Sequence, residues 1–186
     1  MTGDVDHPGE LELRTERLVL RPFRQGDVGD VLAYASDREW SRFLDIRIPF
    51  PYTRADAESF VALAMRNWAA GDLHWAIVLE GRVVGAISLG LAFEGGSASL
   101  GYNLGRAEWG RGLVTEAAGA VLDYPFFVAG MESIEATADA RNVGSWRVME
   151  KLGMTRVGVE PGARRDQAGA VADQVRYRIA RERWAG

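Results

Sequence analysis

The chain has 186 residues, of which 47% are hydrophobic and 26% are charged, and its formal net charge is −4. This composition is typical of a single globular domain, and the negative charge argues against nucleic acid as a partner. The absence of cysteine excludes disulfides, a thiol nucleophile and a thiolate metal site. The sequence shows no secretory signal pattern and no apolar run of about 18 residues, so we expect a cytoplasmic protein without a membrane span.

The first half of the chain combines strand and helix patterns. Residues 1–10 are polar and are expected to form a flexible N-terminus, so the single predicted domain spans 11–184. In chain order, we predict a strand ending at Pro22, a helix within 24–36, an irregular segment at 37–52, a helix from the N-cap Thr53 to Gly71, and two strands within 74–91 joined by a tight turn at Glu80-Gly81.

The second half alternates strands with helices, which predicts an α+β (α/β) fold with one mixed sheet. Consecutive strands favour antiparallel pairs, whereas the strand–helix–strand unit at 97–138 favours a parallel crossover. The predicted elements are a strand at 97–105, a helix ending near Phe127, a strand at 131–140, a helix at 142–153, a strand at 154–162, a loop at 162–170 and a strand at 172–184.

The segment EWGRGLVTEA, residues 108–117, places two glycines between a predicted strand and a predicted helix. Such a turn directs free backbone N–H groups and the positive end of the helix dipole at one point, which favours an anion. Gly110 and Gly112 would let the anion approach closely, and Arg111 would add a positive charge. The alternative for this segment is a glycine turn without a ligand.

Two common phosphate-binding motifs do not fit this segment. A P-loop needs lysine followed by serine or threonine after the second glycine, where this chain has Leu113 and Val114. A dinucleotide fingerprint needs a third glycine or alanine, where this chain has Thr115. This segment therefore does not identify the kind of anion by itself, and a second motif is needed.

The second motif is NVGSWRVMEKLGM, residues 142–154. Together with GYNLGRAEWGRGLVTEA, residues 101–117, it resembles the GCN5-related N-acetyltransferase (GNAT) superfamily, and within it the branch of ribosomal-protein N-terminal acetyltransferases. The resemblance covers roughly residues 11–180, taking in two ordered motifs and the order of elements. The matching positions are Gly101-Tyr102, Trp109-Gly110-Arg111-Gly112, Thr115-Glu116-Ala117, Asn142, Ser145 and Glu150-Lys151-Leu152-Gly153-Met154.

The resemblance implies a GNAT-like acyl-CoA N-acyltransferase fold, with a twisted, mostly antiparallel sheet of about six or seven strands and about four helices. It implies acetyl-CoA as co-substrate and acetyl transfer to a primary amine by direct attack in a ternary complex. A non-catalytic acyl-CoA-binding domain on the same fold is the alternative. The implied acetyl-CoA contacts are Tyr102, Asn103, Leu104, Trp109, Gly110, Arg111, Gly112, Leu113, Val114, Thr115, Asn142 and Ser145.

The resemblance also implies catalytic roles that this sequence fills only in part. Ser145 is the candidate proton donor to the departing thiolate, although a serine at a helix start also bonds the backbone. Asn142 would contact the pantetheine arm, cap the helix, or do both. Many relatives carry glutamate where this chain has Ser99, so the general base is unassigned. Candidates for the base, each also interpretable as structural, are Glu94, Glu108, Glu135, Asp139 and His74.

The acceptor amine would bind near the irregular 37–52 segment and the helix after it. Trp40, Phe43 and Tyr52 are the candidate acceptor contacts in this aromatic region, which also contains Phe50 and Trp68. The acceptor is either a peptide N-terminus or a small-molecule amine. The two histidines are isolated from acidic clusters, so we expect no metal site. Family members suggest a monomer or a homodimer.

Overall fold

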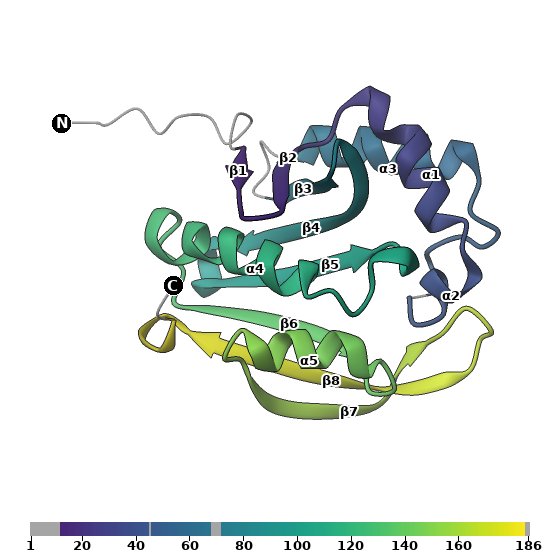
Figure 1. The fold of residues 1–186 in the computed structure, drawn as a ribbon. Helices are drawn as coiled ribbons and strands as arrows, with labels where there is room; N and C mark the ends of the chain where they lie inside the picture. The colour runs from purple at the N-terminus through teal and green to yellow at the C-terminus, as the bar shows by residue number, and fades with distance from the viewer. Residues whose placement is uncertain (1–11, 45, 68–71, 185–186) are drawn as a thin grey trace.

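The computed structural model describes residues 12–44, 46–67 and 72–184 of the chain. The expected flexible N-terminus at 1–10, the predicted helix stop at Gly71 and the aromatic Trp68 lie outside the described residues. Within the described ranges, one mixed sheet carries helices on both of its faces (Figure 1).

The sheet has eight strands in the described ranges, in the order β1-β2-β3-β4-β5-β6-β8-β7. We expected about six or seven, and the difference arises because the first predicted strand folds as a hairpin. The Thr15 N–H donates to the Leu18 carbonyl at 3.0 Å and closes this hairpin. The strands are β1 (Leu13–Arg14), β2 (Leu18–Pro22), β3 (Asp72–Leu79), β4 (Arg82–Ala92), β5 (Ser97–Leu104), β6 (Ser133–Asp139), β7 (Thr155–Arg165) and β8 (Val171–Ala180).

The described ranges contain five α-helices, where about four were expected. The additional helix, α2, lies in the 37–52 segment that was predicted to be irregular. It forms because the Asp37 carboxylate caps it, accepting a hydrogen bond from the Glu39 N–H at 2.8 Å. The helices are α1 (Val28–Ala35), α2 (Arg38–Ser41), α3 (Arg54–Asn67), α4 (Leu113–Asp123), which continues into a π-helical turn at Tyr124–Val128, and α5 (Val143–Lys151).

Of two predicted connections between strands, the structure confirms one and shortens the other. The tight turn between β3 and β4 is confirmed, with φ of 51° at Glu80 and 81° at Gly81. The loop predicted at 162–170 is too long, because β7 continues to Arg165, which pairs with Val171 of β8. Pairing between the strands thus shortens the connection to residues 166–170.

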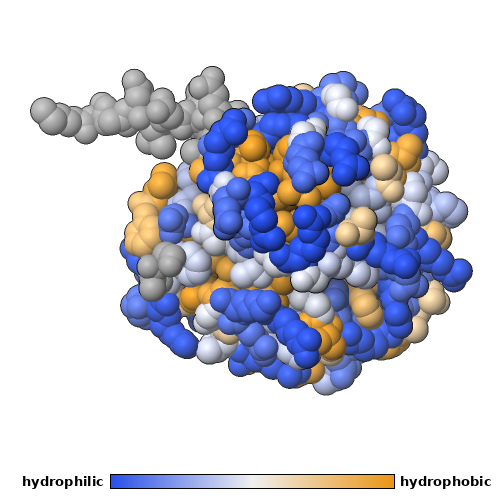
Figure 2. All heavy atoms as spheres, in the orientation of Figure 1, coloured by the Kyte–Doolittle hydropathy of each residue, from blue (hydrophilic) through white to orange (hydrophobic). Residues whose placement is uncertain are grey.

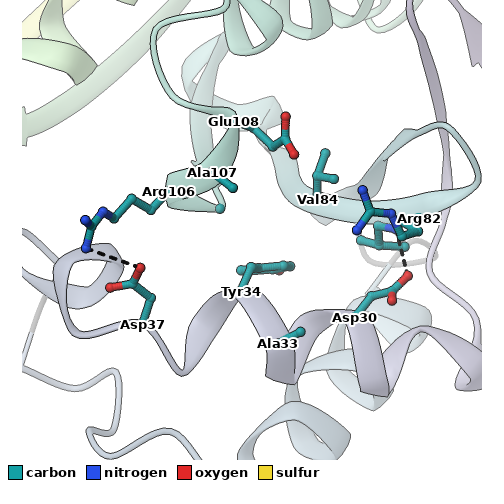
Figure 3. A pocket seen from close by; sticks show the side chains of 11 residues that line it. Asp30, Ala33, Tyr34, Asp37, Arg82, Val84, Arg106, Ala107 and Glu108 are labelled. Carbon is teal, nitrogen blue, oxygen red and sulfur yellow. Dashed lines mark hydrogen bonds and ion pairs between the residues drawn. The ribbon is translucent and has the colours of Figure 1, made fainter.

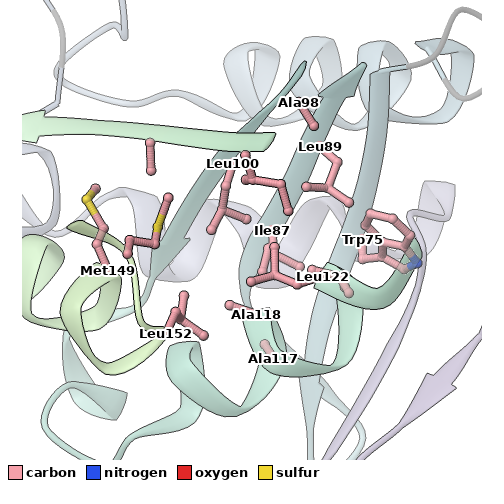
Figure 4. Packing of buried hydrophobic residues seen from close by; sticks show 14 of the residues in the cluster. Trp75, Ile87, Leu89, Ala98, Leu100, Ala117, Ala118, Leu122, Met149 and Leu152 are labelled. Carbon is pink, nitrogen blue, oxygen red and sulfur yellow. The ribbon is translucent and has the colours of Figure 1, made fainter. Parts of the chain in front are cut away.

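Two hydrophobic clusters lie on opposite faces of the sheet. The larger cluster packs α4 and α5 against the strands, and the smaller packs α1 and α3 against the other face. Figure 4 shows how Ala117 and Ala118, whose small side chains allow close approach, let α4 lie near Ile87 of β4. On the face shown in Figure 2, hydrophobic residues form several separate areas among hydrophilic ones.

The pairing of β5 with β6 is the single parallel contact among the described strands, and it is short. It covers three pairs, from Ser97 with Ser133 to Ser99 with Glu135. Beyond Ser99, β5 continues to pair with β4, while β6 continues to pair with β8. The two strands therefore separate and leave a split in the middle of the sheet (Figure 1).

Gly85 of β4 supports one edge of this split, because a side chain there would strike β5. A Cβ atom at Gly85 would lie 2.4 Å from the Asn103 carbonyl oxygen and 3.0 Å from the Leu104 Cα atom. We predict that Gly85→Ala lowers the free energy of unfolding by about 2 kcal/mol, measured by urea denaturation.

The matched control is Gly119→Ala on α4, where a Cβ atom would meet no atom within 4 Å. That change should leave stability unchanged or raise it by up to about 1 kcal/mol, because alanine favours helix over glycine. Equal stabilities of Gly85→Ala and the unmodified protein would show that β4 and β5 do not approach as closely as described.

Candidate active site

A cavity of about 630 Å³ lies at the split between β5 and β6. It brings together residues from α2, the end of β5, the glycine-rich loop, the start of α4 and the start of α5. Of the predicted site residues, the lining includes Trp40, Phe43, Tyr102, Asn103, Leu104, Trp109, Gly110, Gly112, Leu113, Val114, Thr115, Asn142 and Ser145, whereas Arg111 and Tyr52 are not among the lining residues.

The glycine-rich loop presents backbone to this cavity. Gly110 and Gly112 have φ of 75° and 76°, in the left-handed region that favours glycine. A Cβ atom at Gly110 would meet nothing within 4 Å, so the space beside it is open. No side chain caps α4 at Gly112, which leaves first-turn N–H groups available at the positive end of the helix. The loop therefore has the backbone conformation and the free N–H groups that an anion site requires.

Side-chain contacts hold the loop in place. The Trp109 indole N–H donates to the Leu104 carbonyl at 2.7 Å and ties the loop to the end of β5. The Arg111 guanidinium forms an ion pair with Glu108, and the Arg111 carbonyl accepts a hydrogen bond from Arg17 at 3.0 Å. These contacts hold Arg111 beside the loop, and Arg111 is not among the residues that line the cavity.

The hairpin between β1 and β2 anchors the first turn of α4. Glu116 accepts hydrogen bonds from the Thr15 hydroxyl and from the Arg17 N–H, the latter at 2.9 Å, and it pairs with the Arg17 guanidinium at 2.6 Å. Burial alone would raise the pKa of Glu116, but these hydrogen bonds outweigh burial and hold it below its ordinary value. The carboxylate is therefore charged and structural.

Cationic side chains line the part of the cavity formed by α5. Arg147 and Lys151 lie four positions apart on α5, so they share one face of the helix, and Arg141 precedes it. The charges of Arg147 and Lys151 suit an anion held at the start of α4, whereas Arg141 is paired with Asp139 and Asp166. Our sequence reasoning did not assign these three residues, although the spacing of Arg147 and Lys151 on a predicted helix was an available signal.

Asn142 and Ser145 lie at the start of α5, opposite Tyr102 of β5. The Asn142 side chain caps the helix by accepting a hydrogen bond from the Ser145 N–H at 3.2 Å. The Tyr102 hydroxyl donates to the Ser145 carbonyl at 2.7 Å and lies 3.1 Å from the Ser145 hydroxyl. Because tyrosine has one hydroxyl proton, the Ser145 hydroxyl is the donor in the second contact. Burial raises the pKa of Tyr102 to about 12, so Tyr102 stays protonated.

The aromatic residues Trp40 and Phe43 line the α2 side of the cavity. The Trp40 ring lies between Tyr34 at 5.6 Å and Tyr52 at 5.9 Å, measured between ring centroids. Tyr52 thus packs against Trp40 without being among the residues that line the cavity. The Phe43 ring lies 6.0 Å from the guanidinium carbon of Arg141, so it spans from the α2 segment to the start of α5.

Of the five residues weighed as general bases, only Glu108 lines the cavity, and it is paired with Arg111. Asp139 is buried and receives hydrogen bonds from Arg141, which outweigh the effect of burial and keep the pKa of Asp139 below its ordinary value. Ser99 is exposed and lies at the last pair between β5 and β6. Glu39, which the sequence did not single out, also lines the cavity.

A smaller pocket of about 240 Å³ lies between α1 and the ends of β4 and β5 (Figure 3). Its three carboxylates already have partners: Asp30 accepts from the Val83 N–H at 2.8 Å, Asp37 pairs with Arg106 at 3.7 Å, and Glu108 pairs with Arg111. Its lining includes none of the predicted cofactor- or acceptor-binding residues.

Among the residues that the structure describes, no group of three or more histidine, aspartate or glutamate side chains is arranged to hold a metal ion. None of the helices in those ranges is long and apolar enough to cross a membrane.

Comparison with known proteins places these features in a family. Residues 17–155 match the family model described as an acetyltransferase (GNAT) domain. A Bacillus subtilis protein described as a probable N-acetyltransferase, YjcK, is 30% identical over 154 residues, which cover 79% of this chain and 85% of that protein.

Two solved structures share the fold. The ribosomal-protein-S5-alanine acetyltransferase from Vibrio fischeri aligns with a TM-score of 0.81 at 17% identity, covering 95% of this chain and all of that one. The microcin C7 self-immunity acetyltransferase MccE, solved with acetyl-CoA and AMP, aligns with a TM-score of 0.76 at 20% identity, covering 89% and 93%. The family-model match covers most of the chain and the fold agrees with it, so this protein belongs to the acetyltransferase (GNAT) domain family and is an acyltransferase that uses acetyl-CoA as co-substrate.

Proposed function

We propose that this enzyme transfers the acetyl group of acetyl-CoA to a primary amine that attacks directly while both substrates are bound. The observation that supports this most is the cavity at the split of the sheet, which joins the glycine-rich loop to the aromatic α2 segment. One cavity in contact with both regions allows two substrates to meet without a covalent enzyme intermediate.

Acetyl-CoA would occupy the side of the cavity formed by α4 and α5. The N–H groups of Leu113, Val114 and Thr115 would bind its pyrophosphate, because α4 has no side-chain cap and its dipole favours an anion. Gly110 and Gly112 would give the phosphates room, and the α5 cations would add attraction. We assign Arg111 a different role from the one the sequence predicts: paired with Glu108, it would position the loop.

The chain would assist the reaction in three places. The attacking nitrogen bonds the acetyl carbon as the carbon–sulfur bond breaks, so the carbonyl oxygen and then the sulfur gain negative charge. Backbone N–H groups at 102–104, next to the split, would stabilise the oxygen. The sulfur, a thiolate with an ordinary pKa of about 8.5, would take a proton through Ser145, while the amine gives up one to water.

Tyr102 gives this assignment a geometric basis. Because its own proton goes to the Ser145 carbonyl, the Tyr102 oxygen can only accept from the Ser145 hydroxyl in this structure. Ser145 must therefore turn its hydroxyl from Tyr102 toward the sulfur when it acts. Asn142 would orient this end of α5 as its N-cap.

The function is tested by titrating the protein with acetyl-CoA in a calorimeter and by following thiol release with a broad amine panel. Amino acids, peptides with free N-termini, aminoglycosides and polyamines would be included. We expect binding and amine-dependent thiol release. Binding of acetyl-CoA with no thiol release for any amine of the panel would support a non-catalytic domain. A lack of acetyl-CoA binding would contradict the family's activity in this chain.

We predict that Ser145→Ala lowers kcat by about tenfold to a hundredfold and leaves the affinity for acetyl-CoA nearly unchanged, because it removes a proton donor at the sulfur. Steady-state kinetics and calorimetry would measure the two effects. The matched control is Ser99→Ala, which changes an exposed serine outside the cavity and should keep full kcat. An unchanged kcat in Ser145→Ala would leave Ser145 with a purely structural role.

We also predict that Gly112→Asp weakens acetyl-CoA binding by at least tenfold, as measured by calorimetry. The substitution strains a residue with φ of 76° and places a carboxylate beside the expected phosphates. Gly112→Ala separates these effects, because it adds the strain without the charge and should weaken binding less. If both variants bind acetyl-CoA as the unmodified protein does, the phosphate site lies elsewhere.

A further inference from the structure

Two residues that line the cavity each carry a buried polar atom with no hydrogen-bond partner among the described residues. These atoms are the indole nitrogen Nε1 of Trp40 and the side-chain oxygen Oδ1 of Asn103. Burying a polar atom without a partner costs free energy, so such atoms are uncommon in folded proteins. Because both residues line one cavity, a ligand bound there is the candidate partner for both atoms.

Both atoms belong to the face of the sheet opposite the proposed acetyl-CoA side. Asn103 pairs with Ala86 across β4 and β5, and paired residues share a face. Ala86 belongs to the cluster that packs α1 and α3, whereas the preceding residue Tyr102 packs with the α4 and α5 cluster. The Trp40 ring packs on Tyr34 of α1, on the same side as Asn103.

The residues packed around Trp40 limit which hydrogen-bond acceptors of the chain its indole N–H can reach. Its ring lies between the rings of Tyr34 and Tyr52, so rotating it would break both contacts. Both polar atoms are covered in this structure, so the side chains around them must move before a ligand reaches them. Trp40 belongs to α2, and a helix of only four residues has few hydrogen bonds to break when it moves.

We propose that Asn103 and Trp40 recognise the acceptor, and that the acceptor is an amine with an oxygen on a neighbouring carbon. This inference rests on the proposed function. Asn103 Oδ1 accepts an N–H from the amine, which leaves the nitrogen lone pair free to attack. The Trp40 indole donates to the neighbouring oxygen. Amino alcohols and α-amino carbonyl compounds fit this pattern, whereas a plain alkylamine has no group to accept the Trp40 N–H.

Three small amines of similar size test this pattern. Ethanolamine carries a hydroxyl and glycinamide a carbonyl oxygen on the carbon next to the amine carbon. In n-propylamine the same carbon carries only a methyl group and hydrogens. Rates are compared per concentration of neutral amine, because the three amines have different pKa values. We expect kcat/KM for ethanolamine or glycinamide to exceed that for n-propylamine by about tenfold or more. The stronger of the two identifies the acceptor as an amino alcohol or an α-amino carbonyl compound.

Variants connect the preference to the two residues. Trp40→Phe keeps an aromatic ring but removes the N–H, so the ratio of kcat/KM between the preferred amine and n-propylamine should fall toward one. The matched control is Trp184→Phe, which removes an indole N–H that donates to Asp123 at 2.7 Å outside the cavity, and it should keep the ratio. Asn103→Leu should lower kcat/KM for all three amines by about tenfold, and Asn103→Asp, which keeps an oxygen, should recover part of it.

Several results would overturn the proposal while leaving the acetyltransferase function intact. One is equal kcat/KM for the three amines in the unmodified protein. Another is an unchanged ratio in Trp40→Phe together with unchanged rates in Asn103→Leu. Melting temperatures and acetyl-CoA titrations would identify a misfolded variant. If either Trp40→Phe or Asn103→Leu is misfolded, the result for the other one tests the proposal. Acetyl-CoA binding without acetylation of any amine would overturn both this proposal and the proposed function.

Discussion

The short parallel contact between β5 and β6 is the constraint on which the rest of the site depends. After Ser99 and Glu135 the two strands separate, although each keeps its other neighbour. Backbone N–H and carbonyl groups along the separated edges lose their ladder partners, and buried groups of this kind need others. The cavity lies here, so a bound substrate with amide groups can take the place of a strand.

The loop and helix that face this split are held by contacts with the first hairpin and with the end of β5. Glu116 joins the start of α4 to Thr15 and Arg17 in the first hairpin, and Trp109 joins the loop to the end of β5. Such contacts fix the backbone N–H groups before a ligand arrives, which lowers the entropy cost of binding. Small alanines on α4 allow the helix to pack closely on the sheet and complete this arrangement.

Local chemistry explains what the sequence predicted well. The glycines at 110 and 112, the N-caps Thr53 and Asn142 and the Glu80-Gly81 turn each depend on near neighbours, and the structure has them as expected. Contacts between residues far apart in the chain could not be predicted from local sequence patterns. Tyr102 meets Ser145 because β5 and α5 lie on either side of one split, and Arg17 of the first hairpin binds the Arg111 carbonyl from 94 positions away. The first hairpin was missed because the prediction joined the apolar residues on both sides of the polar segment 14–17 into one strand, although a turn lies in this segment.

The central claim is that acetyl-CoA binds along the split and against the start of α4. Hydrogen–deuterium exchange with and without acetyl-CoA tests it most directly, because it reports on backbone N–H groups themselves. We expect slower exchange for amides of Gly112–Thr115 and of β5 beyond Ser99, which line or border the cavity. Protection confined to the smaller pocket between α1 and β4, with no change at the start of α4, would contradict it.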